Sequence, residues 1–268
     1  MTTLHIALAQ MTVRAGDVSA NQATAERLVT QAAVAGAELA ILPELWATGY
    51  DWPCIHERAT SLGEDLWAGM ADLAQDRGVY LIGSLPLAEG GSLYNAAGLF
   101  DPAGQVVGVY RKTHLFGPMQ EPAHFTPGNE LPTFELPWGR TALAICYDVR
   151  FPEVFRSYAA AGAVLMLVCT QWPRRRIPHW DILLPARAIE NQCVVAGCNA
   201  VGQALGQPLG GRSAAYGPWG ETLAHTDETE TVVMAHVDMD IVAQARAAFP
   251  FVADLNRESI RGLIAEVG

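Results

Sequence analysis

Short apolar runs and amphipathic stretches alternate along the first third of the chain. The runs have the length of buried strands, and the stretches between them repeat apolar residues at helical spacing. Gly36 and Gly78 directly follow the two amphipathic stretches, and glycine is the usual residue after the last turn of a helix. The pattern predicts strands over residues 5–10, 38–43 and 79–85, and helices over residues 21–35 and 64–77.

The middle of the chain changes to a hairpin pattern. Asp101-Pro102-Ala103-Gly104 is a strong turn signal, and it separates apolar segments at residues 93–100 and 105–111. Part of the sheet is therefore expected to be antiparallel. Residues 112–128 are rich in proline, glycine and histidine, and they are expected to form an ordered loop.

Strands and helices alternate again in the second half. Proline in the first turn supports a helix over residues 178–191. The segment Pro218-Trp219-Gly220-Glu221 predicts a turn between two further strands, and the tail after Asp240 indicates one short helix and an extended end. The remaining predicted elements are strands over residues 141–146, 164–169, 193–199 and 231–237, and a helix over residues 152–161.

This order of elements predicts an α/β fold. The hairpins indicate two sheets that pack face to face, with helices on the outside. Neither an internal repeat nor a low-complexity linker interrupts the pattern, so a single domain over residues 1–268 is the simplest organisation.

Charge and composition exclude several classes of protein. The chain has 268 residues, of which 50% are hydrophobic, and this is enough to bury a large core. Its formal net charge of −11 argues against a general nucleic-acid-binding protein, which needs a basic surface. No uncharged apolar stretch reaches the roughly 18 residues of a membrane span. The one basic cluster, Arg174-Arg175-Arg176, is either a solvated loop or an anion clamp at a pocket.

The cysteines predict a reducing environment. There are five of them, scattered along the chain, and an odd set of this kind is a poor disulfide framework. The N-terminus lacks the basic and apolar regions of a signal peptide. We therefore expect a cytoplasmic protein, in which a catalytic thiol would stay free to react.

Cys146 lies where a predicted buried strand gives way to a predicted helix. Backbone N–H groups and the positive end of a helix at such a turn are expected to lower the pKa of a thiol. A buried structural cysteine is the common alternative, and position alone does not decide between the two.

Two further polar residues come at predicted strand ends, and a third, Glu121, lies in the expected loop at 112–128. Glu44 directly follows the strand at 38–43, where burial would suit a general base. Lys112 closes the strand at 105–111, where it could stabilise an oxyanion. Taken alone, each is more often an exposed surface residue, and Glu121 is a loop residue with no distinguishing pattern. Motifs of other site types are absent, since there is no Gly-x-Ser-x-Gly elbow, no P-loop and no His-x-x-x-His pair.

Three motifs, taken in order, resemble the nitrilase superfamily of carbon–nitrogen hydrolases. They are Leu42-Pro43-Glu44-Leu45, the segment Tyr110-Arg111-Lys112-Thr113-His114-Leu115-Phe116, and Cys146-Tyr147-Asp148-Val149-Arg150-Phe151-Pro152. The resemblance covers residues 6–256. It implies a four-layer α-β-β-α sandwich that assembles as a homodimer or a higher homo-oligomer and uses no metal or organic cofactor.

The resemblance also implies roles for individual residues. Glu44 would be the general base, Lys112 the oxyanion-stabilising lysine and Cys146 the nucleophile. Glu121 would be the second glutamate, which positions the substrate and the lysine. Candidate substrate-binding residues are expected near the same strand ends, and they are Tyr147, Phe116, Thr170, Gln171 and Trp172.

Other segments indicate which members of the nitrilase superfamily the chain resembles most. Gln171-Trp172-Pro173, His179-Trp180 and residues 186–192 resemble bacterial ω-amidase-like members. Those members act on ω-amides of small 2-oxo dicarboxylic acids, of the 2-oxoglutaramate or 2-oxosuccinamate type. The expected partner is therefore a small-molecule amide. Deaminated glutathione is the nearest alternative substrate, followed by a nitrile or an N-carbamoyl amine. A catalytically silent interaction protein of the same fold is the alternative from a different class.

Overall fold

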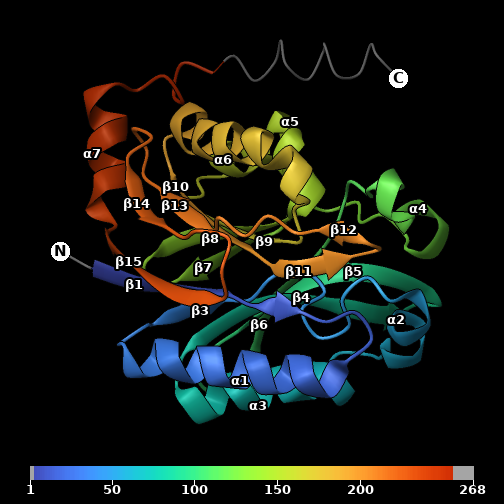
Figure 1. Ribbon diagram of the computed structural model, residues 1–268. Coiled ribbons are helices and arrows are strands. Elements are labelled where there is room, and N and C mark those ends of the chain that lie inside the picture. Colours follow the sequence, from blue (N-terminus) through green and yellow to red (C-terminus); the bar gives the residue numbers. More distant parts are fainter. Residues whose placement is uncertain (1–2, 256–268) are drawn as a thin grey trace.

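Two six-stranded sheets pack face to face, and helices cover their outer faces (Figure 1). The computed structural model describes residues 3–255. Helices α1 (Val18–Val34) and α3 (Asp65–Arg77) lie together on one side of the sandwich, and α5 (Pro152–Ala160) and α6 (Ile177–Asn191) lie on the other. The predicted four-layer α-β-β-α sandwich is confirmed.

The first sheet has the strand order β15-β1-β3-β4-β5-β6. Strands β1, β3 and β4 are parallel, and the remaining neighbours pair antiparallel, including the predicted hairpin of β5 and β6. The strands are β1 (Thr3–Gln10), β3 (Leu39–Ile41), β4 (Tyr80–Glu89), β5 (Ser92–Phe100), β6 (Val106–Arg111) and β15 (Thr231–Asp238).

The second sheet repeats this plan in the order β14-β13-β10-β9-β8-β7. Strands β8, β9 and β10 are parallel at its centre, and the outer strands are antiparallel. The strands are β7 (Thr133–Leu136), β8 (Gly139–Ile145), β9 (Leu165–Thr170), β10 (Val194–Asn199), β13 (Ala214–Tyr216) and β14 (Thr222–His225). A small third sheet joins β2 (Thr12–Val13), β11 (Val201–Ala204) and β12 (Gln207–Pro208).

Strand β1 shows why these elements read as continuous apolar runs. Its side chains alternate between two buried faces, because one face meets the second sheet and the other meets the helices. Leu4, Ile6 and Leu8 pack in the cluster that includes the second sheet, while Ala7 and Ala9 pack with α1.

Several short elements were not predicted. Helix α2 (Trp52–Arg58) was not foreseen, and the expected loop at residues 112–128 contains helix α4 (Glu121–His124) and a 3-10 turn at Gly117–Met119. Such elements are too short to show a period in the sequence. The predicted C-terminal helix is α7 (Asp240–Ala248); the extended end expected after it runs beyond residue 255, outside the described residues. Among residues 3–255, none of the helices combines the length and apolarity needed to cross a membrane.

Candidate active site

Glu44, Lys112 and Cys146 all lie just beyond the ends of strands. Lys112 directly follows β6, Cys146 directly follows β8, and Glu44 comes three residues after β3. All three are buried, with exposed fractions of 0% for Glu44, 1% for Lys112 and 5% for Cys146. Three polar groups removed from water at one edge of the sandwich require mutual compensation.

Lys112 provides that compensation for two carboxylates. Its Nζ donates to Glu44 Oε1 at 2.7 Å and to Glu121 Oε1 at 2.8 Å. Burial alone would lower the pKa of Lys112, but the negative charges of Glu121 and Glu44 outweigh it and raise that pKa. The lysine therefore stays charged, with two anions fixed around it. Glu121, which had no distinguishing sequence pattern, is fully buried at the first position of α4.

Tyr50 and Asn95 also bind both carboxylates, and sequence reasoning missed them. The Tyr50 hydroxyl lies 2.9 Å from Glu44 Oε1 and 2.6 Å from Glu121 Oε1. Asn95 Nδ2 lies 2.9 Å and 3.2 Å from the same two atoms. Burial and the charges of Glu121 and Glu44 raise the pKa of Tyr50, so its phenol is a neutral donor. A polar residue inside the apolar strand at 93–100 was the one available signal for Asn95.

Two predicted substrate-binding residues, Gln171 and Phe116, donate hydrogen bonds to the two glutamates. The Gln171 backbone N–H donates to Glu44 Oε2 at 3.0 Å, and Gln171 Nε2 donates to the Glu44 carbonyl at 2.7 Å. The Phe116 backbone N–H donates to Glu121 Oε2 at 2.5 Å. Thr170 is fully buried beside Cys146, and the contact of its hydroxyl with the thiol opposes the rise of the thiol pKa.

A residue with left-handed backbone lies at or directly beside three of the four catalytic candidates. Cys146 itself has φ of +46°, Leu45 beside Glu44 has +41°, and Gln120 beside Glu121 has +64°. Such a conformation in a residue other than glycine costs about 1–3 kcal/mol and persists only where the surroundings impose it. The strained backbone at these turns therefore lowers the stability of the fold, and it fixes the direction of the catalytic side chains.

The pKa of the Cys146 thiol is raised, so the expected lowering is wrong. Burial is the largest cause and the charge of Glu44 the next, while Lys112 opposes them. A 3-10 turn at Cys146–Arg150 separates the thiol from α5, which begins at Pro152, so the helix N-terminus is not at the sulfur. The resting thiol is consequently protonated, and its reaction requires a base.

Asp148 ties the Lys112 segment to the Cys146 turn. Its Oδ2 accepts from the Ile145 backbone N–H at 2.9 Å and from the Tyr110 hydroxyl at 2.8 Å. Its Oδ1 accepts from the backbone N–H and the Nδ1 of His114 at 3.1 and 3.0 Å, and from Thr113 Oγ1 at 3.2 Å. One fully buried carboxylate thus holds residues on both sides of Cys146 and of Lys112.

Asp148→Asn is expected to destabilise the protein by about 1–3 kcal/mol. The NH2 group of the new amide would face the N–H and O–H groups that now donate to an Asp148 oxygen, so buried donors would lose their acceptor. We also expect kcat to fall at least tenfold at temperatures where the variant is folded, since Cys146 and Lys112 lose a common anchor. Thermal unfolding and steady-state kinetics measure the two effects. Asp76→Asn, an exposed change on α3, is the matched control. Wild-type kcat in a folded Asp148→Asn protein would contradict the anchoring role.

The opening beside Cys146 is narrow. Its volume is about 10 Å³, room for roughly one water. Its walls are Phe116, Tyr147, Arg150, Trp172, Pro173 and Arg176. Three of the five predicted substrate-binding residues therefore line it. Of the basic cluster at 174–176, only Arg176 does so, because Arg174 pairs with Glu228.

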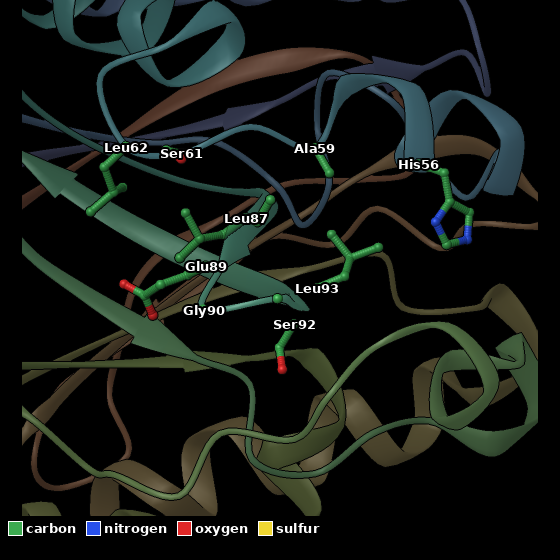
Figure 2. Close-up of a pocket in the computed structure, with 11 residues that line it drawn as sticks. His56, Ala59, Ser61, Leu62, Leu87, Glu89, Gly90, Ser92 and Leu93 are labelled. Carbon is green, nitrogen blue, oxygen red and sulfur yellow. The ribbon is translucent and has the colours of Figure 1, made fainter.

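A larger hollow of about 740 Å³ lies at the turn between β4 and β5 (Figure 2). It is formed by residues 87–93 with His56, Ala59, Ser61 and Leu62. Its one acidic side chain, Glu89, is paired with Arg111. None of the four catalytic candidates lines it, so it lacks the convergent polar groups that characterise a reaction site. Among residues 3–255, no group of three or more His, Cys, Asp or Glu side chains is placed to hold a metal ion.

A protein-family model and known relatives match most of the chain. The carbon-nitrogen hydrolase family model matches residues 5–247. The chain is 37% identical over 223 residues to a 2-oxoglutaramate amidase of Bacillus subtilis (strain 168), covering 83% of this chain and 86% of that one.

Solved structures agree as well. XC1258 from Xanthomonas campestris, a CN-hydrolase superfamily protein with an arsenic adduct in its active site, superimposes with a TM-score of 0.89. It is 29% identical, covering 96% of this chain and 98% of its own. The amidase from Nesterenkonia sp. AN1, in a variant that carries acrylamide on its active-site cysteine, gives a TM-score of 0.80. It is 34% identical, covering 91% and 97% of the two chains.

Proposed function

The chain belongs to the carbon-nitrogen hydrolase family and is a hydrolase of amide C–N bonds; on that premise we propose that its substrate is the ω-amide of a small 2-oxo dicarboxylic acid. The 2-oxoglutaramate and 2-oxosuccinamate types are the candidates, and ammonia is the first product. The observation that carries the proposal is the buried constellation of Glu44, Lys112 and Glu121 beside the Cys146 thiol.

Cys146 begins the reaction as a nucleophile. Glu44 takes the thiol proton while the sulfur attacks the amide carbonyl, which forms the C–S bond of a tetrahedral intermediate. A base is needed here because the pKa of Cys146 is raised. Lys112 and the Tyr147 backbone N–H stabilise the negative charge on the carbonyl oxygen. The C–N bond then breaks, and Glu44 returns the proton to the leaving ammonia.

Hydrolysis of the thioester completes the cycle. Glu44 takes a proton from water, the resulting hydroxide attacks the acyl carbon, and the proton returns to the departing Cys146 sulfur. Glu121 does not move a proton in this scheme. Its bond to Lys112 Nζ, like that of Glu44, fixes the ammonium beside the reacting carbon.

The name of the Bacillus relative, 2-oxoglutaramate amidase, supports the proposed substrate class. The opening beside Cys146 has a volume of about 10 Å³, so any of the candidate substrates must displace wall side chains to reach the thiol.

Product release from a substrate panel tests the proposal. Ammonia is measured for the ω-amides, the nitrile and the N-carbamoyl amine, and the freed dipeptide amine is measured for deaminated glutathione, whose hydrolysis releases no ammonia. We expect kcat/KM for 2-oxoglutaramate or 2-oxosuccinamate to exceed that for deaminated glutathione, a nitrile and an N-carbamoyl amine by at least tenfold. A preference for deaminated glutathione would replace the proposed substrate. Silence across the whole panel would favour the non-catalytic interaction protein. The cytoplasmic location and the homodimer stay predictions.

A further inference from the structure

Two arginines stand at the mouth of the Cys146 opening without an anionic partner. Arg150 belongs to the turn that starts at Cys146, and Arg176 ends the basic cluster that precedes α6. Neither guanidinium pairs with a carboxylate of residues 3–255, although the chain has 28 acidic residues against 17 basic ones. These two arginines are distinguished by their place, because both line the opening beside Cys146.

Arg176 has a buried donor that lacks a hydrogen-bond acceptor. Its Nη1 is buried and has no hydrogen-bond partner among the described residues. Leaving such a donor unsatisfied costs about 1–3 kcal/mol, and more when the group is charged. Burial, followed by the positive charges of Arg175 and Arg150, lowers the pKa of Arg176. An anion placed between Arg150 and Arg176 would relieve both the missing bond and the repulsion.

Aromatic rings hold the two guanidinium groups beside the nucleophile. Arg176 lies over Phe116 with its Cζ 5.2 Å from the ring centre, and Arg150 lies over Trp172 at 4.7 Å. Arg150 Nη1 also contacts His179 Nδ1 at 3.1 Å. Stacking restrains each guanidinium without occupying all its N–H donors, so donors remain for a ligand.

We propose that Arg176, with Arg150, binds the carboxylate of the substrate at the end remote from the scissile amide. The inference rests on the proposed function and adds how the site selects its substrate. A bound carboxylate fixes the orientation, so that the amide end of the chain meets Cys146. A neutral amide of equal length lacks this contact and gives up the corresponding binding energy.

A matched pair of substrates tests this carboxylate clamp. The pair is 2-oxoglutaramate and its methyl ester, which differ in charge at the remote end. We expect the wild-type ratio of their kcat/KM values to favour the acid. Arg176→Gln should reduce that ratio roughly 10- to 100-fold, the value of one hydrogen-bonded charge contact. Arg176→Lys should retain part of the ratio, because lysine keeps the positive charge but cannot donate the two parallel hydrogen bonds of a guanidinium to one carboxylate.

Arg174→Gln is the matched control. It makes the same change of charge two residues away, at a side chain that is 62% exposed and paired with Glu228. The control should leave the substrate ratio within about twofold of wild type, as is usual for an exposed ion pair. An equal fall in the control would show a general charge effect and overturn the clamp.

A binding measurement separates the clamp from the proposed function. Calorimetry with the Cys146→Ala protein reads the Kd of 2-oxoglutarate, which has the same remote carboxylate, without turnover. Adding Arg176→Gln should weaken binding roughly 10- to 100-fold. If that loss appears while the wild type hydrolyses no amide, the clamp stands and the proposed function fails. If the wild type hydrolyses 2-oxoglutaramate but Arg176→Gln changes neither the ratio nor the Kd, the clamp is wrong.

Discussion

Cys146→Ala is expected to abolish amide hydrolysis, with kcat reduced roughly 10⁴-fold or more, as when the nucleophile of a covalent hydrolase is removed. The loss is chemical, because the remaining contacts of Glu44, Lys112 and Glu121 do not include the thiol as a hydrogen-bond partner. Ammonia release measures it. Cys193→Ala, which also replaces a fully buried cysteine, should retain wild-type kcat.

Cys146→Ala should also make the stability of the protein less sensitive to alkaline pH. Burial raises the pKa of the Cys146 thiol above its unfolded value of about 8.5. The neutral thiol therefore contributes stability that is fully present below pH 8.5 and is lost as the pH rises toward the folded-state pKa. Wild type should lose more stability than Cys146→Ala between pH 8 and pH 10. An equal loss in both proteins would contradict the raised pKa.

Lys112→Met should inactivate the protein and destabilise it at the same time. Two buried carboxylates, Glu44 and Glu121, would lose their shared cation. Removing one partner of a buried ion pair costs about 3–5 kcal/mol, which lowers the Tm of a chain of this length by roughly 10 °C. Loss of the oxyanion contact should reduce kcat by about 10²–10³-fold. Thermal unfolding and ammonia release measure the two effects.

A second substitution distinguishes this explanation from simple damage. Adding Glu121→Gln to Lys112→Met removes one of the two repelling charges, so the double variant should be more stable than the single one while remaining inactive. A double variant less stable than Lys112→Met would contradict the account.

The sequence predicts the parts of the site that follow apolar runs. Glu44, Lys112 and Cys146 each come at or just beyond a recognisable strand end, and strands of two packed sheets bring their ends together. Tyr50 and Asn95 were missed because their contacts with Glu44 and Glu121 depend on how distant segments meet. No spacing along the chain records that meeting.

The properties of buried groups were predicted less well than their positions. The pKa of Cys146 was expected to fall because a helix was predicted to start beside it. The structure places a 3-10 turn there and buries the sulfur, and desolvation depends on everything that closes over the thiol. Arg174, Arg175 and Arg176 are likewise equivalent in sequence, yet only Arg176 turns toward the opening.

The acyl-enzyme is the most direct test of the central claim. Wild-type protein is mixed with 2-oxoglutaramate, quenched in acid within a single turnover, and its intact mass is measured together with that of Cys146→Ala. We predict an added mass equal to one 2-oxoglutaryl group, located at Cys146 by peptide mapping and absent from the variant. Ammonia release by Cys146→Ala, or an acyl group on a different residue, would contradict Cys146 as the nucleophile.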